Sequence, residues 1–276
     1  MFKDITLGKF INVKSTLHSL DPRVKIIGLF VYFITIFIFG NFICYIIAGF
    51  TLLALMKLSN IKFRLIFKSL KSILSLLVLS ALLNLFLTNG RVIFSFWIFN
   101  ITYEGLKISI KMCVRLMILI MCSSLLTYTT TPKRLTDAIE SFLSPLSVFA
   151  IPTSEISMMI GIALRFVPVL AGEVDRITTA QKSRGVDFES GGIRQKIKVI
   201  IPIIVPLFIS AFKRSDSLSL AMEARCFGCV LNKNGFVIRS KLHPLKYNKV
   251  DFTAFAIMVI YFIIMLVASH FNFSIL

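Results

Sequence analysis

The sequence predicts an all-α, polytopic membrane protein with about five transmembrane helices, one amphipathic helix and two long helices. Two observations support this prediction. Of 276 residues, 57% are hydrophobic and only 16% are charged, whereas a soluble domain is about half apolar and a quarter charged. The mean hydropathy is +0.86, and the apolar residues gather in stretches close to the roughly 20 residues that a membrane-spanning helix needs.

Five stretches are candidate spans. They cover residues 24–39, 42–57, 70–88, 107–128 and 252–270. The start of the first span is marked by Asp21 and Pro22, because Asp is a favoured N-cap and proline is well tolerated at the first helical position. Only Gly40-Asn41 separates the first two spans, so we expect them to form a tight hairpin.

Basic residues predict the orientation of these spans. The net charge is +18, and lysine and arginine favour the cytoplasmic side of a membrane. Three basic clusters fall on one side if the N-terminus is cytoplasmic: Lys14, Arg23 and Lys25; Lys57, Lys62, Arg64, Lys68 and Lys71; and Lys133 and Arg134. We therefore expect a multi-pass protein of the plasma membrane, with no cleavable signal peptide and with a short, β-rich extracellular segment at 89–105. Nothing in the basic pattern indicates nucleic acid as a partner.

One basic stripe does not fit this orientation. Lys107, Lys111 and Arg115 recur every four residues, so they share one face of the fourth span near its outer end. Two interpretations are open. The side chains could extend towards lipid headgroups, or they could face a partner or a solvated groove.

Residues 131–249 differ from the rest of the chain. Thr131 and Pro132 mark another helix start. The apolar residues that follow at helical spacing are Leu135, Ala138, Ile139, Phe142, Leu143 and Leu146. Lys133, Arg134, Asp137 and Glu140 lie mostly elsewhere on this helix, so it is amphipathic, and we expect it at the cytoplasmic interface.

The same region is strongly basic. Residues 131–249 contain 17 Lys and Arg against 9 Asp and Glu. We therefore expect its two long helices to be cytoplasmic or interfacial rather than two further spans. This pattern divides the chain into residues 1–130 (N-terminal spans), 131–249 (cytoplasmic module) and 250–276 (C-terminal span).

A hexapeptide occurs twice in this module. "AQKSRG" at 180–185 is followed by "AMEARC" at 221–226, with alanine at the first place and arginine at the fifth. The likeness extends upstream, since Pro168 precedes Arg176 by eight residues and Pro206 precedes Arg214 by eight. The two long helices are therefore an imperfect duplication, in which the second copy is three residues longer.

The hexapeptides could present two arginines to partners. Gly185 fits the left-handed position that closes a helix, so Arg184 would be the last side chain of a rigid helix, and Arg225 would repeat the arrangement with Gly228 reversing the chain. A guanidinium offers five donors and keeps its charge when it is desolvated. The neighbours that complete the candidate docking set are Ala180, Gln181, Ser183, Gly185, Ala221, Glu223, Ala224 and Cys226. Ordinary helix capping is the alternative.

The chain resembles the transmembrane T component of energy-coupling factor (ECF) transporters over nearly its whole length. The resemblance rests on "STLHSLDPRVK", "LLTYTTTPKRL", "ALRFVPVL", "AQKSRGVDF" and "AMEARCFG". Ser183 and Cys226 stand where that family usually has alanine and glycine.

The resemblance implies a non-catalytic scaffold of a vitamin or metal-ion importer. Two crossed coupling helices would end at Arg184 and Arg225, and each arginine would insert into one of two cytoplasmic ATP-binding-cassette (ABC) ATPases. Arg165, Pro168 and Pro206 would shape the coupling helices. A separate membrane S component would bind the substrate, and the ATPases would bind ATP-Mg, so no cofactor is expected on this chain.

Two other functions remain as alternatives: an integral membrane enzyme acting on lipid or isoprenoid substrates, and a stand-alone secondary transporter. The sequence contains no G-x-x-x-x-G-K-[ST] phosphate loop, so ATP hydrolysis by this chain is not expected. Its three histidines are scattered at 18, 243 and 270. The pair Cys226 and Cys229 lacks the two further ligands that a structural zinc site usually has, so no metal site is expected.

Overall fold

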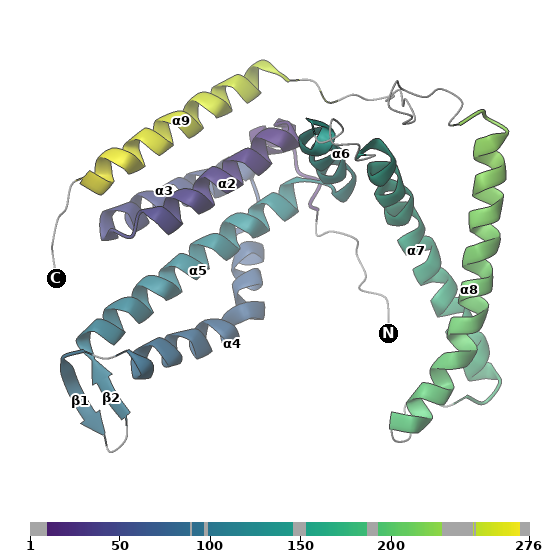
Figure 1. The fold of residues 1–276 in the computed structure, drawn as a ribbon, viewed down its shortest axis with the longest axis horizontal. Coiled ribbons are helices and arrows are strands. Elements are labelled where there is room, and N and C mark those ends of the chain that lie inside the picture. The colour runs from purple at the N-terminus through teal and green to yellow at the C-terminus, as the bar shows by residue number, and fades with distance from the viewer. Residues whose placement is uncertain are drawn as a thin grey trace. The chain divides into compact units, whose positions relative to one another are not determined.

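The computed structural model describes residues 10–88, 90–96, 99–145, 153–186, 193–227, 245 and 247–270. Apart from one β-hairpin, the described elements are helices (Figure 1), and the predicted all-α polytopic fold is confirmed. The chain separates into two compact units. The membrane unit comprises Lys9–Thr131 and Leu245–Leu276, and the long-helix unit comprises Met1–Gly8 and Pro132–Pro244. These divisions fall near residues 131 and 249, and the roles predicted for the three segments remain predictions.

The membrane unit follows the predicted order of spans. Its elements are α1 Thr16–Ser19, α2 Pro22–Ile38, α3 Phe42–Ser59, α4 Phe63–Leu87, β1 Val92–Phe96, β2 Phe99–Thr102, α5 Tyr103–Thr129 and α9 Lys249–His270. The predicted cap at Asp21 is confirmed, because its carboxylate accepts a hydrogen bond of 2.9 Å from the Arg23 backbone N–H. The antiparallel hairpin of β1 and β2 confirms the β-rich character of residues 89–105.

The helices that could cross a membrane are not the same set as the five predicted spans. Among the described residues, four helices are long and apolar enough to cross a membrane, or five if the two parts of α4 form one span. The four are Phe42–Ser59, Tyr103–Thr129, Glu155–Ser183 and Lys249–Ser269. The third of these lies in a long helix that we expected outside the bilayer; it has this composition because most of its charges follow Leu170. In contrast, α2 has only 17 residues, which is at the lower limit for a span.

α4 is longer than predicted and is bent. It begins at Phe63 rather than near residue 70. Its first part, Phe63–Lys71, makes an angle of 57° with its second part, Ile73–Leu87. The second part packs along α5. Gly105 allows this contact, since an added Cβ would come within 3.0 Å of the Leu85 carbonyl oxygen.

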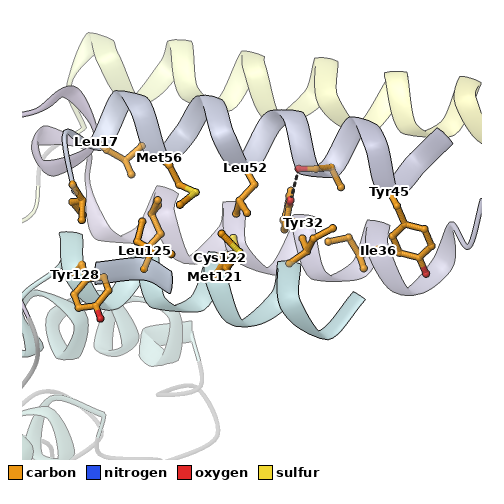
Figure 2. Close-up of a cluster of buried hydrophobic side chains, with 14 residues drawn as sticks. Leu17, Tyr32, Ile36, Tyr45, Leu52, Met56, Met121, Cys122, Leu125 and Tyr128 are labelled. Atoms are coloured by element: carbon orange, nitrogen blue, oxygen red, sulfur yellow. Dashed lines mark hydrogen bonds between the residues drawn. The ribbon is translucent and has the colours of Figure 1, made fainter. Parts of the chain in front are cut away.

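The core of the membrane unit lies between α2, α3 and α5 (Figure 2). Its buried side chains include Ile36 from α2, Met56 from α3 and Leu125 from α5. Tyr32 is buried beside them, and its hydroxyl donates a hydrogen bond of 2.7 Å to the Ala48 carbonyl (Figure 2). This bond satisfies a polar group where the bilayer provides no water.

A buried carboxylate attaches α9 to α2. Asp251, which is 1% exposed, accepts hydrogen bonds of 2.8 Å from the Asp21 N–H and 2.7 Å from the Asn248 N–H. It therefore satisfies backbone donors at the starts of both helices. Further along, Tyr32 and Tyr261 stack with ring centroids 5.6 Å apart. The C-terminal helix is thus fixed to the first span by polar and aromatic contacts.

The long-helix unit contains α6 Pro132–Leu143, α7 Thr153–Ser183 and α8 Ile193–Glu223. α6 begins at Pro132, as predicted. One prediction for its surface is wrong, because Glu140 is buried and accepts a hydrogen bond of 2.5 Å from the Ser157 hydroxyl on α7. Ile139 and Phe142, predicted on the apolar face, are 42% and 39% exposed. The surface of α6 turned towards α7 is therefore partly polar.

Candidate functional site

α7 ends in a Schellman motif that places Arg184 at the helix tip. The Gly185 N–H donates to the Lys182 carbonyl at 3.0 Å, and the Val186 N–H donates to the Gln181 carbonyl at 3.1 Å. Gly185 has φ +85°, the left-handed conformation that this motif requires. The predicted closure of α7 at Gly185 is therefore confirmed, and Arg184 is the last residue before the chain turns away.

α8 ends in the same backbone motif at the equivalent position of the repeat. The Cys226 N–H donates to the Glu223 carbonyl at 2.9 Å, and the Phe227 N–H donates to the Met222 carbonyl at 2.9 Å. The left-handed residue is Cys226, with φ +53°. We predicted the chain reversal at Gly228, which lies outside the described residues. The reversal occurs two residues earlier and places a side chain where glycine would avoid a cost of about 1–2 kcal/mol.

The candidate docking residues form two exposed tips. Gln181 is half-buried, and the other members are exposed: Ala180, Ser183, Arg184, Gly185, Ala221, Glu223, Ala224, Arg225 and Cys226. Within the part of the chain that the structure describes, neither arginine side chain has a hydrogen bond or ion pair. Both guanidinium groups are therefore available to a partner, at helix ends whose dipole favours a cation.

The two tips point to opposite ends of one helix pair. α7 and α8 cross and run in opposite directions (Figure 1). Arg214 of α8 forms an ion pair of 3.4 Å with Glu173 of α7, so both residues contribute to the crossing. Arg184 follows Glu173 by 11 residues, and Arg225 follows Arg214 by 11 residues. The two arms beyond this ion pair therefore have equal length.

The residues predicted to shape the long helices are separate from the tips. Pro168 lies inside α7, and Pro202 and Pro206 lie inside α8. A proline inside a helix removes a backbone hydrogen bond and favours a bend. Arg165 is exposed on α7, three residues before Pro168. Their predicted roles remain predictions.

Large apolar side chains are exposed along both long helices. On α7 they are Met159, Ile160, Val167 and Val169, and on α8 they are Ile200, Ile201, Ile204, Val205, Phe208, Ile209, Phe212 and Leu220. A groove of about 770 Å³ between the helices is lined by Phe166 of α7 and by residues of α8 that include Pro206 and Arg214. Apolar surface of this extent is typical of a binding surface.

Arg115, one member of the basic stripe on α5, has aromatic partners inside the membrane unit. The Nε of Arg115 donates a hydrogen bond of 3.1 Å to the Tyr45 hydroxyl. Its guanidinium lies 5.3 Å from the Phe37 ring centroid and 6.0 Å from that of Tyr45. Cation–π contacts of this kind stabilise a desolvated arginine. No pattern in the sequence indicated these two aromatic partners, which lie at the end of α2 and at the start of α3.

The described ranges give little support for a metal-binding or redox site. The described residues contain no group of three or more His, Cys, Asp or Glu that could hold a metal ion. Cys226 is an exposed free thiol, and Cys229 and His243 lie outside the described residues. The prominent candidate site is therefore the pair of arginine tips.

The apolar spans and the long helices that end in exposed arginines define a polytopic membrane protein with two candidate docking tips. Residues 13–234 match the family CbiQ, described as cobalt transport protein. The chain belongs to this family, as a T component of ECF transporters.

Relatives named energy-coupling factor transporter transmembrane protein EcfT match almost end to end. One from Ruminiclostridium cellulolyticum is 44% identical over 262 residues, which are 95% of this chain and 96% of the relative. One from Clostridium kluyveri is 45% identical over 258 residues, 92% and 93% of the two chains. One from Streptococcus thermophilus is 41% identical over 245 residues, 88% and 90% of the two chains. The protein is thus a multi-pass membrane component of an ECF transporter that contains other subunits.

Proposed function

We propose that this chain is the non-catalytic scaffold that couples two ABC ATPases to a substrate-binding S component in a vitamin or metal-ion importer. In this proposal the N-terminus and the long-helix unit are cytoplasmic. The ATPases bind and hydrolyse ATP-Mg, and this chain carries no cofactor. Its task is to convert movements of the ATPases into a reorientation of the S component that releases substrate inward.

The repeated Schellman tip carries this proposal. Arg184 and Arg225 occupy the same position in two identical backbone motifs, and both are exposed. A helix cap alone would need no arginine at this place, since the motif is made by backbone groups. A guanidinium at a rigid end can form paired hydrogen bonds with a carboxylate in a partner's groove. Two tips at opposite ends of the helix pair suit two partner subunits rather than one.

The exposed apolar faces of α7 and α8 support the proposed coupling to the S component. Rigid helices held at both tips would change their crossing when the ATPases approach or separate, and a two-state packing change of this kind can transmit work. Phe208 and Phe212 are 59% and 65% exposed on α8. An S component that packs on this face would bury both rings and would move with the helices.

Co-purification of the assembled transporter tests the docking role. The chain is co-expressed with the two ATPases and the S component, extracted in detergent and isolated by a tag on this chain. The test variant combines Arg184→Glu with Arg225→Glu. The matched control combines Arg176→Glu with Lys213→Glu, which makes the same charge change at exposed positions of the same two helices.

Specific docking predicts loss of both ATPases from the test variant and wild-type recovery with the control. Each single variant should weaken the contact with one ATPase only. Equal recovery with wild type and test variant would mean that the arginines only cap their helices. Equal loss from both double variants would mean that net charge, and not the tips, holds the ATPases.

A further inference from the structure

The first part of α4 carries a surface that the proposed function does not use. Phe63–Lys71 is bent by 57° from the rest of α4, so it does not continue the direction of the following span. One side of the segment is held in the membrane unit. Ile66 is 0% exposed, and the Ser69 hydroxyl lies 2.9 Å from the Tyr128 hydroxyl. The opposite sides remain uncovered.

Those uncovered sides separate into an aromatic strip and a basic strip. Since successive residues of a helix are rotated by about 100°, Phe63 and Phe67 lie roughly 40° apart, and they are 47% and 53% exposed. Arg64, Lys68 and Lys71 fall within roughly 60° of one another on the adjoining side, and all three are exposed. The segment is therefore a short amphipathic helix with a third, buried side.

No acidic side chain pairs with the basic strip in the described part of the chain. In the ranges that the structure describes, the side chains of Lys62, Arg64, Lys68 and Lys71 form no hydrogen bond or ion pair. The sequence contains no Asp or Glu between Asp21 and Glu104, so the stretches that flank this segment along the chain supply none either. Four cations gathered in ten residues repel one another unless an anionic partner neutralises them.

We propose that residues 62–71 lie in the membrane–water interface and bind the headgroups of anionic phospholipids. The phenylalanine rings would enter the boundary between headgroups and acyl chains, as the apolar face of an interfacial helix does. The basic strip would then lie at the level of the lipid phosphates. Each lysine or arginine near an anionic membrane surface strengthens binding.

The exposed rings favour a membrane over a soluble polyanion. A phosphate compound in water would neutralise Arg64 and Lys68 but would leave Phe63 and Phe67 in contact with water. A lipid surface accommodates both strips at once, because its phosphates and acyl chains are adjacent in the same order. The bend also suits an interface, since it turns the segment away from the span that begins at Ile73.

Native mass spectrometry of the detergent-solubilised chain measures this selectivity. The chain is titrated with phosphatidylglycerol and, separately, with phosphatidylcholine. The test variant combines Arg64→Gln, Lys68→Gln and Lys71→Gln. Its matched control removes three exposed basic residues elsewhere in the same unit, with Lys14→Gln, Arg91→Gln and Lys249→Gln.

The wild type should prefer phosphatidylglycerol. Neutralisation should lower its affinity about fivefold per charge, or about 100-fold for the three, and phosphatidylcholine binding should stay unchanged. Raised salt should reduce the wild-type preference, and the control variant should keep it. Equal affinity for the two lipids, or equal losses in both variants, would overturn the proposal.

A second measurement leaves the basic residues in place. Trp97→Phe removes the one native tryptophan, and Phe67→Trp adds a reporter on the aromatic strip. In nanodiscs, brominated phosphatidylglycerol should quench this reporter more strongly than brominated phosphatidylcholine at the same mole fraction. Absence of quenching, or equal quenching by both lipids, would overturn the proposal. Recovery of the ATPases with the triple variant should match wild type, which separates this surface from the arginine tips.

Discussion

The membrane unit and the long-helix unit use apolar residues in opposite ways. In the membrane unit, α2, α3 and α5 bury side chains against one another in a common cluster (Figure 2). The most apolar window of α3 is 33% buried within the chain, whereas that of α7 is only 6% buried. Both helices are apolar enough to span a membrane. The difference is therefore one of packing, not of composition.

This difference distinguishes apolar residues that stabilise the fold of the chain from apolar residues that are free to bind a partner. An apolar side chain buried within the chain stabilises the fold, while one left exposed along a helix contributes only when something covers it. The described part of the long-helix unit has buried residues where α6 meets the beginning of α7, such as Ala138 and Ser157. Beyond that point, α7 and α8 expose large apolar side chains. Substitutions should therefore damage folding in one unit and assembly in the other.

The largest effect on stability should come from Asp251→Ala. Its carboxylate accepts two backbone hydrogen bonds in a buried place, and each donor left unsatisfied costs about 1–3 kcal/mol. We expect the melting temperature in detergent, followed by fluorescence-detected size-exclusion chromatography, to fall by more than about 5 °C.

Asp216→Ala is the matched control in the long-helix unit, because Asp216 is an exposed acid on α8. It should melt within about 1 °C of wild type, as surface substitutions usually change stability little. Similar melting of the two variants would show that the buried carboxylate does not hold α9 to α2.

The next effect should be on assembly rather than folding. Phe208→Ser with Phe212→Ser removes two exposed rings whose centroids lie 6.2 Å apart. The chain should remain monodisperse and keep both ATPases. Because burying a phenylalanine is worth about 1.5–3 kcal/mol, recovery of the S component should fall about tenfold or more.

A serine substitution at a buried residue of the membrane unit should instead affect folding. Ile36→Ser places a hydroxyl at a site that is 1% exposed, and it should reduce the yield of folded protein. If the double serine variant instead aggregated, α8 would be covered within this chain, and the distinction between the two units would fail.

A smaller effect distinguishes the two tips. Gly185→Cys gives the first tip the residue of the second, and Cys226→Gly does the reverse. A side chain in the left-handed conformation costs about 1–2 kcal/mol, so Gly185→Cys should weaken binding of one ATPase by at most about 30-fold. Cys226→Gly should strengthen binding of the other. Titration of each purified ATPase measures both, and changes of the same sign would contradict the equivalence of the tips.

The smallest effect should be a pH dependence at His18, which lies outside the spans. Burial lowers the pKa of His18 from its ordinary value of 6.5. The folded chain therefore binds this proton less readily than the unfolded chain. Stability should be complete above pH 6.5 and should decline as the pH falls towards the folded-state pKa. The melting temperatures at pH 7.5 and pH 5.5 should differ slightly in wild type and less in the His18→Gln variant. An equal difference in both proteins would exclude His18 as the source of the pH dependence.

Much of the fold was predictable because local signals agree with it. Asp21 and Pro22 fixed the start of α2, Pro132 fixed that of α6, and apolar length marked the spans. The bend in α4 was not predictable, since residues 63–88 contain no proline or glycine and read as one apolar helix with a basic beginning. The apolar windows of α3 and α7 do not by themselves show how much of each helix the chain buries, because burial depends on neighbours that are distant in sequence.

The site was predictable as a pair of arginines but not in its backbone detail. The repeat located both tips, and glycine at 185 indicated how the first one closes. Cysteine is rare in a left-handed position, so Gly228 was the natural expectation for the second. Asp251 was missed for a different reason. An acid in the first turn of a helix is common, and only the fold brings the start of α2 to it.

The helical segments that run from the Glu173–Arg214 ion pair to Arg184 and to Arg225 have equal length. The two segments can therefore act as lever arms of the same length. Eleven residues of helix correspond to an arm of about 16 Å. A sideways displacement of about 3 Å at either end would turn its helix by roughly 10°. Force applied at one end would therefore produce the same rotation as force applied at the other, although one arm closes with glycine and the other with cysteine. Lengthening one arm alone by a residue would break this balance and would also rotate its arginine by about 100°.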